Sequence, residues 1–432
     1  MNASPIRCFG FVLLGSVLSV ACEPTPPEPE LTIVLAGQAL IKKDPRLFWD
    51  DPFGTLRPVL AAADVAFTNF EMAVASTEDR CGLPTDYEVS LGTPELSRES
   101  RPGNSGGPHA VAPQVMEFLA SLGFNLMSLA NNHAWDLGDC GVAATRAAAT
   151  AHGVVHAGVG PDIETATAPS YLTVGGVTLA LIAATTAHDE RDAIRHAVNG
   201  VWTGWPEDRE RNLAAVREAA ARADFVIYYQ HVQLDADEFA EVAPGGETSD
   251  GHRWIEDLPS WQSEFARAVL DAGASVYVGH GQRGFDGVEV FDGKPLIRQL
   301  GGLAYQGLNP DVGAYDEYRP WEGLLAKLVV QRGRTLRIEF TPLDLDEGEA
   351  YRADYDTVDF LSRRGLAQVA TGAKADSILA RLADLSAKYG SGLTVTNGRA
   401  ILVLTSPREA REMSPASLTA ATSATAARTG GR

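Results

Sequence analysis

The sequence predicts an α/β fold in which layers of β-sheet pack together and helices flank them. Apolar strand patterns alternate with amphipathic helical patterns along most of the chain, as in layered α/β proteins. The strands end in polar residues, and the chain has no internal repeat. Because α/β folds bind ligands outside the carboxyl ends of their strands, we expect the functional site there.

Five segments have the apolar composition of buried strands, and each is followed by polar residues. These strands span residues 31–36, 64–68, 126–130, 225–229 and 275–278. Other segments have the spacing of apolar residues that predicts amphipathic helices. These helices span residues 113–122, 141–152, 207–222, 261–272 and 375–388.

Turn signals predict the remaining elements. A Gly-Gly pair predicts a hairpin over residues 172–186, and an Asp-Gly pair predicts a second hairpin after a strand at 288–291. A last strand is expected at 400–404. Residues 77–110 are rich in Gly, Pro and Ser, which indicates a long excursion over the surface.

The composition is that of a globular protein with an acidic surface. Of 432 residues, 45% are hydrophobic and 21% are charged, and the net charge is −20. Binding to phosphate backbones requires clusters of Lys and Arg, so this balance excludes nucleic acid and anionic membrane surfaces as partners.

The N-terminal residues indicate export. Arg7 precedes an apolar segment at 9–21 that has the length of a signal sequence and is too short to span a membrane. Small residues then run into Cys22, as at a lipoprotein cleavage site. Residues 1–22 are therefore predicted to be a signal peptide that leaves Cys22 as a lipid anchor at the bacterial cell envelope. The alternative is ordinary signal cleavage near Ala21.

The domain limits follow from composition. Residues 23–30 are rich in Pro and Glu and are expected to be a linker. One domain is predicted over 31–405, and the Ala, Thr and Ser-rich residues 406–432 are expected to be a disordered tail. After cleavage Cys81 and Cys140 remain, and the sequence leaves open whether they form a disulfide or stay as thiols.

The most informative motif is Asn-Asn-His-Ala-Trp-Asp-Leu-Gly at 131–138. It follows directly after a buried strand. Asn132 offers a neutral carbonyl oxygen to a metal, and His133 can act as a ligand or a proton donor. The structural alternative is an Asn-rich turn capped by Asp136, which explains two Asn and a His less well. The other strand ends add polar residues at the same edge: Gln38, Glu71, His231 and His280.

At these residues the chain resembles the CapA-type capsule-synthesis or poly-γ-glutamate biosynthesis family of the calcineurin-like metallophosphatase superfamily. The resemblance runs from about residue 31 to about 404. The segments that carry it are 63–71, 123–138, 223–231, 271–280 and 287–295. It implies a metallophosphatase-like layered β-sandwich flanked by helices (α/β/β/α), with the site at the strand carboxyl ends.

The family implies a site in which two divalent cations activate a water and hold the oxygens of a phosphate or acyl group. Carried over residue by residue, Glu71, Asn132 and His231 match metal ligands. His133 matches the proton donor, and Asp136 would orient it. The cations expected are manganese, iron or zinc.

Two strand ends depart from the family pattern. Gln38 stands where an aspartate is usual, and the segment 279–283 reads Gly-His-Gly-Gln-Arg in place of Gly-x-His-Pro-His. His280 is expected to serve as a ligand one position away. Loss of these ligands predicts one bound ion or none. Arg283, Gln38 and Asn131 are expected to contact the substrate, Arg283 through its planar fork.

The resulting functional hypothesis is an exported, membrane-anchored protein with a metallophosphatase-type site, active in capsule or poly-γ-glutamate biosynthesis. Its expected partners are an anionic polymer or its precursor and capsule-synthesis membrane proteins. The alternative is a degenerate member that binds an anionic polymer or a partner protein without turnover. A secreted solute-binding module would need two similar lobes, and the sequence shows no such duplication.

Overall fold

The computed structural model describes most of the central domain. The described residues are 30–41, 43–47, 49–76, 79–83, 108–186, 194–201, 206–232, 244–247, 253–255, 260–281, 284–306, 321–331, 333–346 and 364–404. The expected signal segment, most of the linker, the tail and Arg283 lie outside these residues. Within the described part, no helix combines the length and the hydropathy needed to cross a membrane.

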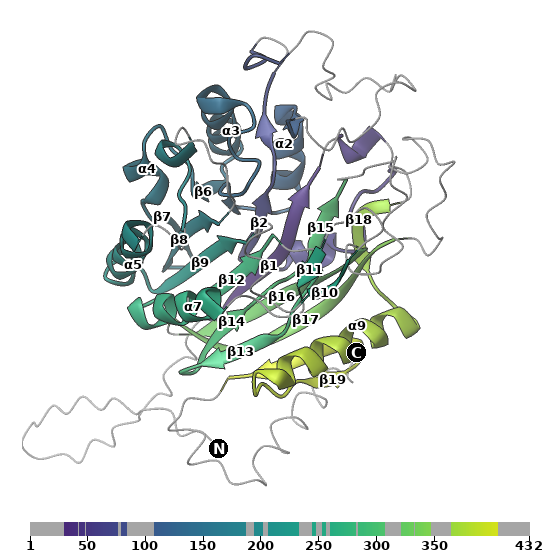
Figure 1. Cartoon of the computed structure of the whole chain (residues 1–432). Helices are drawn as coiled ribbons and strands as arrows, with labels where there is room; N and C mark the ends of the chain where they lie inside the picture. Colours follow the sequence, from purple (N-terminus) through teal and green to yellow (C-terminus); the bar gives the residue numbers. More distant parts are fainter. Residues whose placement is uncertain are drawn as a thin grey trace, which may run out of the picture.

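Two sheets form the body of the molecule (Figure 1). The larger has ten strands in the order β19-β20-β17-β18-β15-β1-β2-β5-β6, with β16 paired to β1 and β17. Its strands are β1 (Leu31–Leu40), β2 (Val65–Phe70), β5 (Leu126–Ser128), β6 (Val155–Ala157), β15 (Gly302–Tyr305), β16 (Glu322–Gln331), β17 (Arg334–Asp346), β18 (Arg364–Val369), β19 (Thr394–Thr396) and β20 (Arg399–Val403). Strands β1, β2, β5 and β6 run parallel, so their carboxyl ends share one edge.

The second sheet has six strands in the order β13-β14-β12-β9-β8-β7. They are β7 (Ser170–Val174), β8 (Val177–Thr185), β9 (Phe225–His231), β12 (Val276–His280), β13 (Val288–Phe291) and β14 (Lys294–Ile297). Two short pairs complete the described strands: β3 (Ala73–Val74) with β4 (Ala110–Val111), and β10 (Pro244–Glu247) with β11 (Arg253–Ile255).

The helices form where the sequence has apolar residues at helical spacing. They are α1 (Arg57–Ala61), α2 (Pro113–Ser121), α3 (Gly138–Ala151), α4 (Ile163–Thr167), α5 (Pro206–Ala220), α7 (Ser260–Ala272) and α9 (Gly372–Lys388), with 3-10 turns η1 (Pro45–Leu47) and η2 (Ile194–His196). Helix α2 begins at Pro113, whose fixed φ and missing N–H suit a first helical position.

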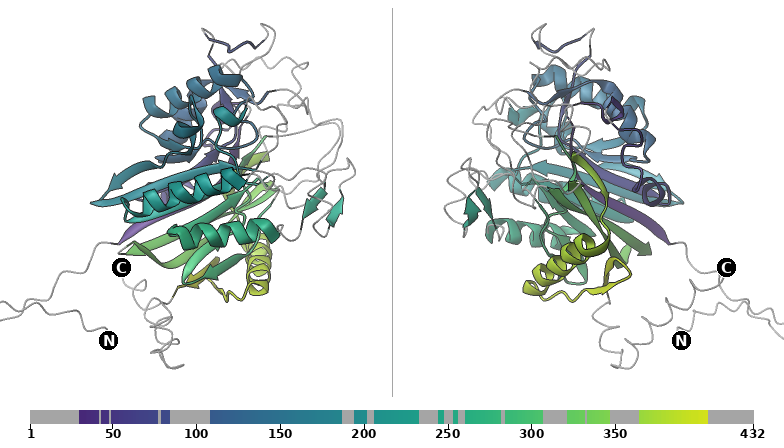
Figure 2. Two further views of the ribbon diagram at one scale, coloured as in Figure 1. Left: turned by 60° about the vertical axis from the view of Figure 1, so that its left-hand side comes forward. Right: turned by 90° about the vertical axis from the view of Figure 1, so that its right-hand side faces the viewer.

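The six-stranded sheet lies between helices and the larger sheet. In β9, Phe225, Ile227 and Tyr229 point into the main core with residues of the ten-stranded sheet. The alternate residues Val226 and Tyr228 pack with α5 and α7 in a second cluster, and Figure 2 shows these two helices along that outer face. This period of two makes β9 buried on both sides.

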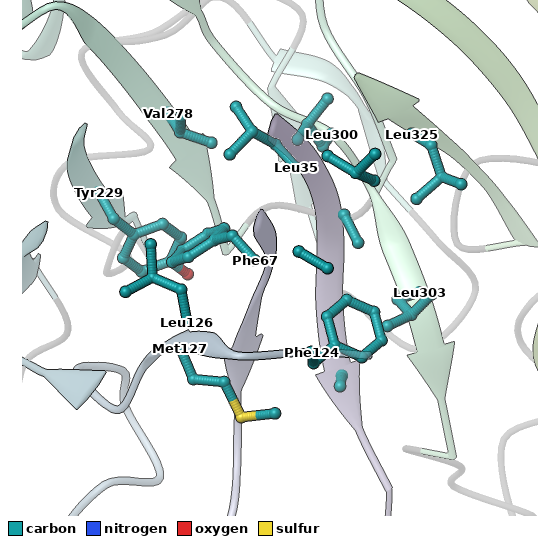
Figure 3. Packing of buried hydrophobic residues seen from close by; sticks show 14 of the residues in the cluster. Leu35, Phe67, Phe124, Leu126, Met127, Tyr229, Val278, Leu300, Leu303 and Leu325 are labelled. Atoms are coloured by element: carbon teal, nitrogen blue, oxygen red, sulfur yellow. The ribbon is translucent and has the colours of Figure 1, made fainter. Parts of the chain in front are cut away.

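Aromatic and aliphatic side chains fill the space between the sheets (Figure 3). The rings of Phe67 on β2 and Tyr229 on β9 lie 5.4 Å apart between centroids. Leu35 on β1 and Val278 on β12 are fully buried in the same core. Because these residues lie a few positions before the ends of their strands, the core fixes how the two sets of strand ends meet.

The predicted mixed α/β fold is confirmed. Strand β1 is longer than expected and runs to Leu40, so Gln38 lies within the strand after an irregularity in its pairing with β2. The long antiparallel pair β16 and β17 was not predicted. In β17 buried Ile338 and Phe340 alternate with the half-buried, charged Arg337 and Glu339, a pattern typical of a strand with one buried face.

Candidate functional site

The carboxyl ends of strands from both sheets meet at one place. Within the larger sheet, Gln38 on β1 lies opposite Asn69 on β2. Within the smaller sheet, His231 on β9 lies opposite His280 on β12. His231 Nε2 approaches Glu71 Oε1 to 3.9 Å and so joins the two sheets. The structure therefore brings the expected residues of four strand ends together.

The turn after β5 is held by Asn131. Its side chain is fully buried, and its Nδ2 donates to the carbonyl oxygen of Phe70 (2.8 Å) and to Asn69 Oδ1 (3.2 Å). Its Oδ1 accepts from the backbone N–H of His133 at 3.0 Å. These contacts give Asn131 a structural role in the turn, since both ends of its amide are engaged by the protein.

His133 and Asp136 form a pair within the next turn of chain. His133 Nδ1 lies 2.9 Å from Asp136 Oδ2, and both side chains are partly exposed. On the other side of the ring, His133 Nε2 lies 3.1 Å from Asn132 Nδ2. The carboxylate thus holds the imidazole by one nitrogen and leaves the other beside Asn132.

His109 belongs to this group and was not identified from the sequence. Its ring stacks on that of His133, with centroids 3.5 Å apart and planes at 19°. Its backbone N–H donates to Asp136 Oδ2 at 2.6 Å. It stands at the end of the predicted surface excursion, and the pairing of β3 with β4 brings it to the site. No local sequence pattern signals that contact.

Three side chains at the site have buried polar atoms without a hydrogen-bond partner among the described residues. The atoms are Oε2 of Glu71, Oδ1 of Asn132, and both ring nitrogens of His280. Burial raises the pKa of the Glu71 carboxyl to about 8, and the charge of Asp136 adds to the rise. Burial lowers the pKa of His280 to about 3, which keeps its imidazole neutral. A carboxyl, an amide oxygen and a neutral imidazole are each groups that bind divalent cations.

Gln38 is already engaged by the protein. Its Oε1 accepts from the backbone N–H of Gly281 at 3.0 Å, and the side chain is buried. This bond joins β1 to the end of β12 across the two sheets.

A second set of ligand atoms is less suited to a metal. Atoms of His109, His133 and Asp136 lie within 4.8 Å of one another. An imidazole nitrogen directs its lone pair in the plane of the ring. The two rings are nearly parallel and 3.5 Å apart, so a single ion cannot lie in both planes. The rings of His109 and His133 are therefore stacked on each other and are not arranged to bind the same metal ion.

A disulfide secures the segment beside the site. Cys81 and Cys140 are bonded, with their Cα atoms 5.4 Å apart, which resolves the pairing that the sequence left open. Cys140 lies in the first turn of α3, just after Asp136. The bond closes a loop of sequence separation 59, and that loop contains both His109 and His133.

Comparison with known proteins identifies the family. The family described as Bacterial capsule synthesis protein PGA_cap matches residues 32–306. "Uncharacterized protein y4sH" of Sinorhizobium fredii is 24% identical over 435 residues, 84% of this chain and 91% of that protein. "PGA biosynthesis protein CapA" of Bacillus subtilis is 26% identical over 316 residues, 73% of this chain and 70% of that protein.

A hypothetical protein of known structure from Thermus thermophilus is 14% identical, covers 73% of this chain and 99% of its own, and has a TM-score of 0.42. At that score the likeness supports no statement about function. The family match extends over more than half of the chain and includes every site residue from Gln38 to His280. The chain belongs to the family of bacterial capsule synthesis proteins.

Proposed function

We propose that this chain is an exported, lipid-anchored protein of capsule or poly-γ-glutamate biosynthesis with a metallophosphatase-type site that binds one divalent cation. The observation that carries this proposal is the set of buried ligand atoms on Glu71, Asn132 and His280, which find no partner in the described part of the chain. His231, fully buried and 3.9 Å from the Glu71 carboxyl, completes the set. Such atoms are costly to bury alone and are satisfied together by a cation.

One ion is favoured over two because of Gln38. A carboxylate at this position would bridge or neutralise a second cation, whereas the Gln38 side chain is neutral and its oxygen accepts from Gly281. Manganese, iron or zinc fits the mixture of imidazole, amide and carboxylate ligands. When bound, the ion would polarise an oxygen of a phosphate or acyl group.

The side chains of the protein would then orient the substrate and supply a proton to it. With Nδ1 of His133 held by Asp136 at 2.9 Å, Nε2 is the nitrogen that can give a proton to a leaving oxygen. Glu71 and His231 would keep the reacting group at the junction of the two sheets. The substrate is an anionic polymer or its precursor, in line with the polymer named for the Bacillus subtilis relative.

A second candidate function rests on the same Gln38–Gly281 bond. If the site has lost its metal affinity along with the missing ligands, the protein binds an anionic polymer or a partner protein of the capsule machinery without turnover. The proposed lipid anchor at Cys22 would hold either form at the cell envelope.

Metal analysis of the purified protein separates the two candidates. We expect about one equivalent of manganese, iron or zinc in the wild type and a strong loss in Glu71→Gln. Glu117→Gln, an exposed glutamate on α2, is the matched control and should keep the metal. A phosphodiesterase assay with added manganese then tests turnover, and His133→Ala should abolish it. A wild type that binds no metal and hydrolyses nothing would leave only the binding role.

A further inference from the structure

His109 covers one face of the His133 ring. The two imidazoles are stacked at 3.5 Å between centroids, while His133 keeps about a fifth of its side-chain surface exposed, 21%. The His109 ring therefore lies against one face of the His133 ring. On the edge of the ring away from Asp136, His133 Nε2 accepts from the Asn132 side-chain amide at 3.1 Å.

The backbone that carries His109 is fixed on both sides. Its carbonyl oxygen accepts from the N–H of Ala73 at 2.9 Å, and the next residues form β4 against β3. Its own N–H donates to Asp136 Oδ2, the same oxygen that lies beside His133 Nδ1. Residue 109 therefore contacts both members of the His133–Asp136 pair, one through its ring and the other through its backbone.

We propose that His109 is a positioning residue for the His133–Asp136 pair. The expected effect of His109 on catalysis rests on the proposed function, in which His133 is the proton donor. A flat ring stacked on His133 limits the ring to one orientation.

The backbone hydrogen bond has a complementary effect. A short N–H contact holds the Asp136 carboxylate in the direction that meets His133 Nδ1. Residues that orient a catalytic or ligating histidine in this way commonly contribute roughly 10–100-fold to activity. The ring of His109 and its N–H can be tested separately, because a side-chain substitution leaves the N–H in place.

The test compares His109→Phe with His109→Ala in the purified protein. Phenylalanine keeps a flat ring over His133, and alanine removes it. His152→Ala is the control, since His152 is exposed at the opposite end of α3. The first readout is the ring signals of ¹³C-labelled histidine by NMR, with the His133 signals assigned from His133→Ala. The second is kcat and KM for a phosphodiester with manganese present, together with the bound metal.

We expect His109→Ala to move the His133 signals away from their stacked position and to lower kcat roughly 10–100-fold, with KM and metal content nearly unchanged. His109→Phe should keep the stacked signals and most of kcat, and His152→Ala should change neither. Unmoved His133 signals in His109→Ala would overturn the proposal, as would equal losses of kcat in the alanine and phenylalanine variants. If the wild type shows no turnover, the proposed function fails, while the NMR signals still decide whether His109 positions His133.

Discussion

The buried carboxyl of Glu71 should make the metal-free protein less stable as the pH rises. The pKa of this group is about 8 in the folded protein, above its ordinary value of 4.5. Between these values the folded state holds a proton that the unfolded state has released. The stability that this bound proton contributes to the folded state is present at low pH and is lost as the pH rises towards 8.

The pH range for the measurement is set by His280, the other buried titratable group at the site with a shifted pKa. His280 has a pKa of about 3 in the fold and 6.5 ordinarily, so its contribution is fully present above pH 6.5 and is lost only at lower pH. Between pH 6.5 and 8, therefore, only Glu71 of these two groups makes the unfolding free energy change with pH. At about 1.4 kcal/mol per pKa unit, these roughly 1.5 units correspond to roughly 2 kcal/mol of unfolding free energy.

The assay is denaturant unfolding of chelator-treated protein at several pH values across that window. Glu71→Gln replaces the neutral carboxyl with a neutral amide and removes the titration. Subtracting the unfolding free energy of this variant from that of the wild type cancels the pH-dependent contributions of the other titrating groups. We expect the difference to fall by roughly 2 kcal/mol as the pH rises, and saturating manganese to suppress the fall. A difference that stays constant with pH would refute the assignment of a buried neutral carboxyl to Glu71.

Three further outcomes are expected. Reducing the Cys81–Cys140 disulfide, or replacing both residues with serine, should lower the unfolding free energy by roughly 4 kcal/mol for a loop of separation 59; an unchanged denaturation midpoint would contradict this. Gln38→Glu keeps an acceptor for Gly281 and adds a charge, so calorimetric titration should show manganese bound about tenfold more tightly, and unchanged affinity would place Gln38 outside the metal's reach. Phe67→Ala leaves a cavity between the sheets and should cost about 3–5 kcal/mol in chemical unfolding, whereas a cost below about 1 kcal/mol would mean that the core closes over it.

Much of the site could be predicted because it lies on regular strands. The strand patterns at 64–68, 225–229 and 275–278 correspond to β2, β9 and β12. Strands β9 and β12 pair in parallel within the smaller sheet, so their ends meet, and β2 belongs to the larger sheet. The polar residues that follow an apolar run are thus placed by local sequence alone. Glu71, His231 and His280 were predicted as strand-end residues in this way, and each lies at or just after the end of its strand.

Contacts between distant segments could not be predicted by the same reasoning. His109 reaches His133 because two strands of two residues pair, and neither strand has a pattern of its own. Gln38 bonds Gly281 because the two sheets approach at their ends. Both contacts depend on tertiary packing across long separations, for which the sequence shows no periodic signal.

The structure also explains why the Asn-Asn-His motif does not by itself define the chemistry. Asn131 holds the turn, Asn132 has a buried oxygen with no partner among the described residues, and His133 is held by Asp136. The charge that attracts a cation must come from elsewhere, and Glu71 is the buried carboxyl that faces His231. Because the pKa of Glu71 is about 8, a cation bound by Glu71 at neutral pH would displace its proton, and the proposed metal affinity would rise with pH until Glu71 is ionised. In the proposed site the motif would position the ligands, and the ionisation of Glu71 would determine how tightly they hold a metal.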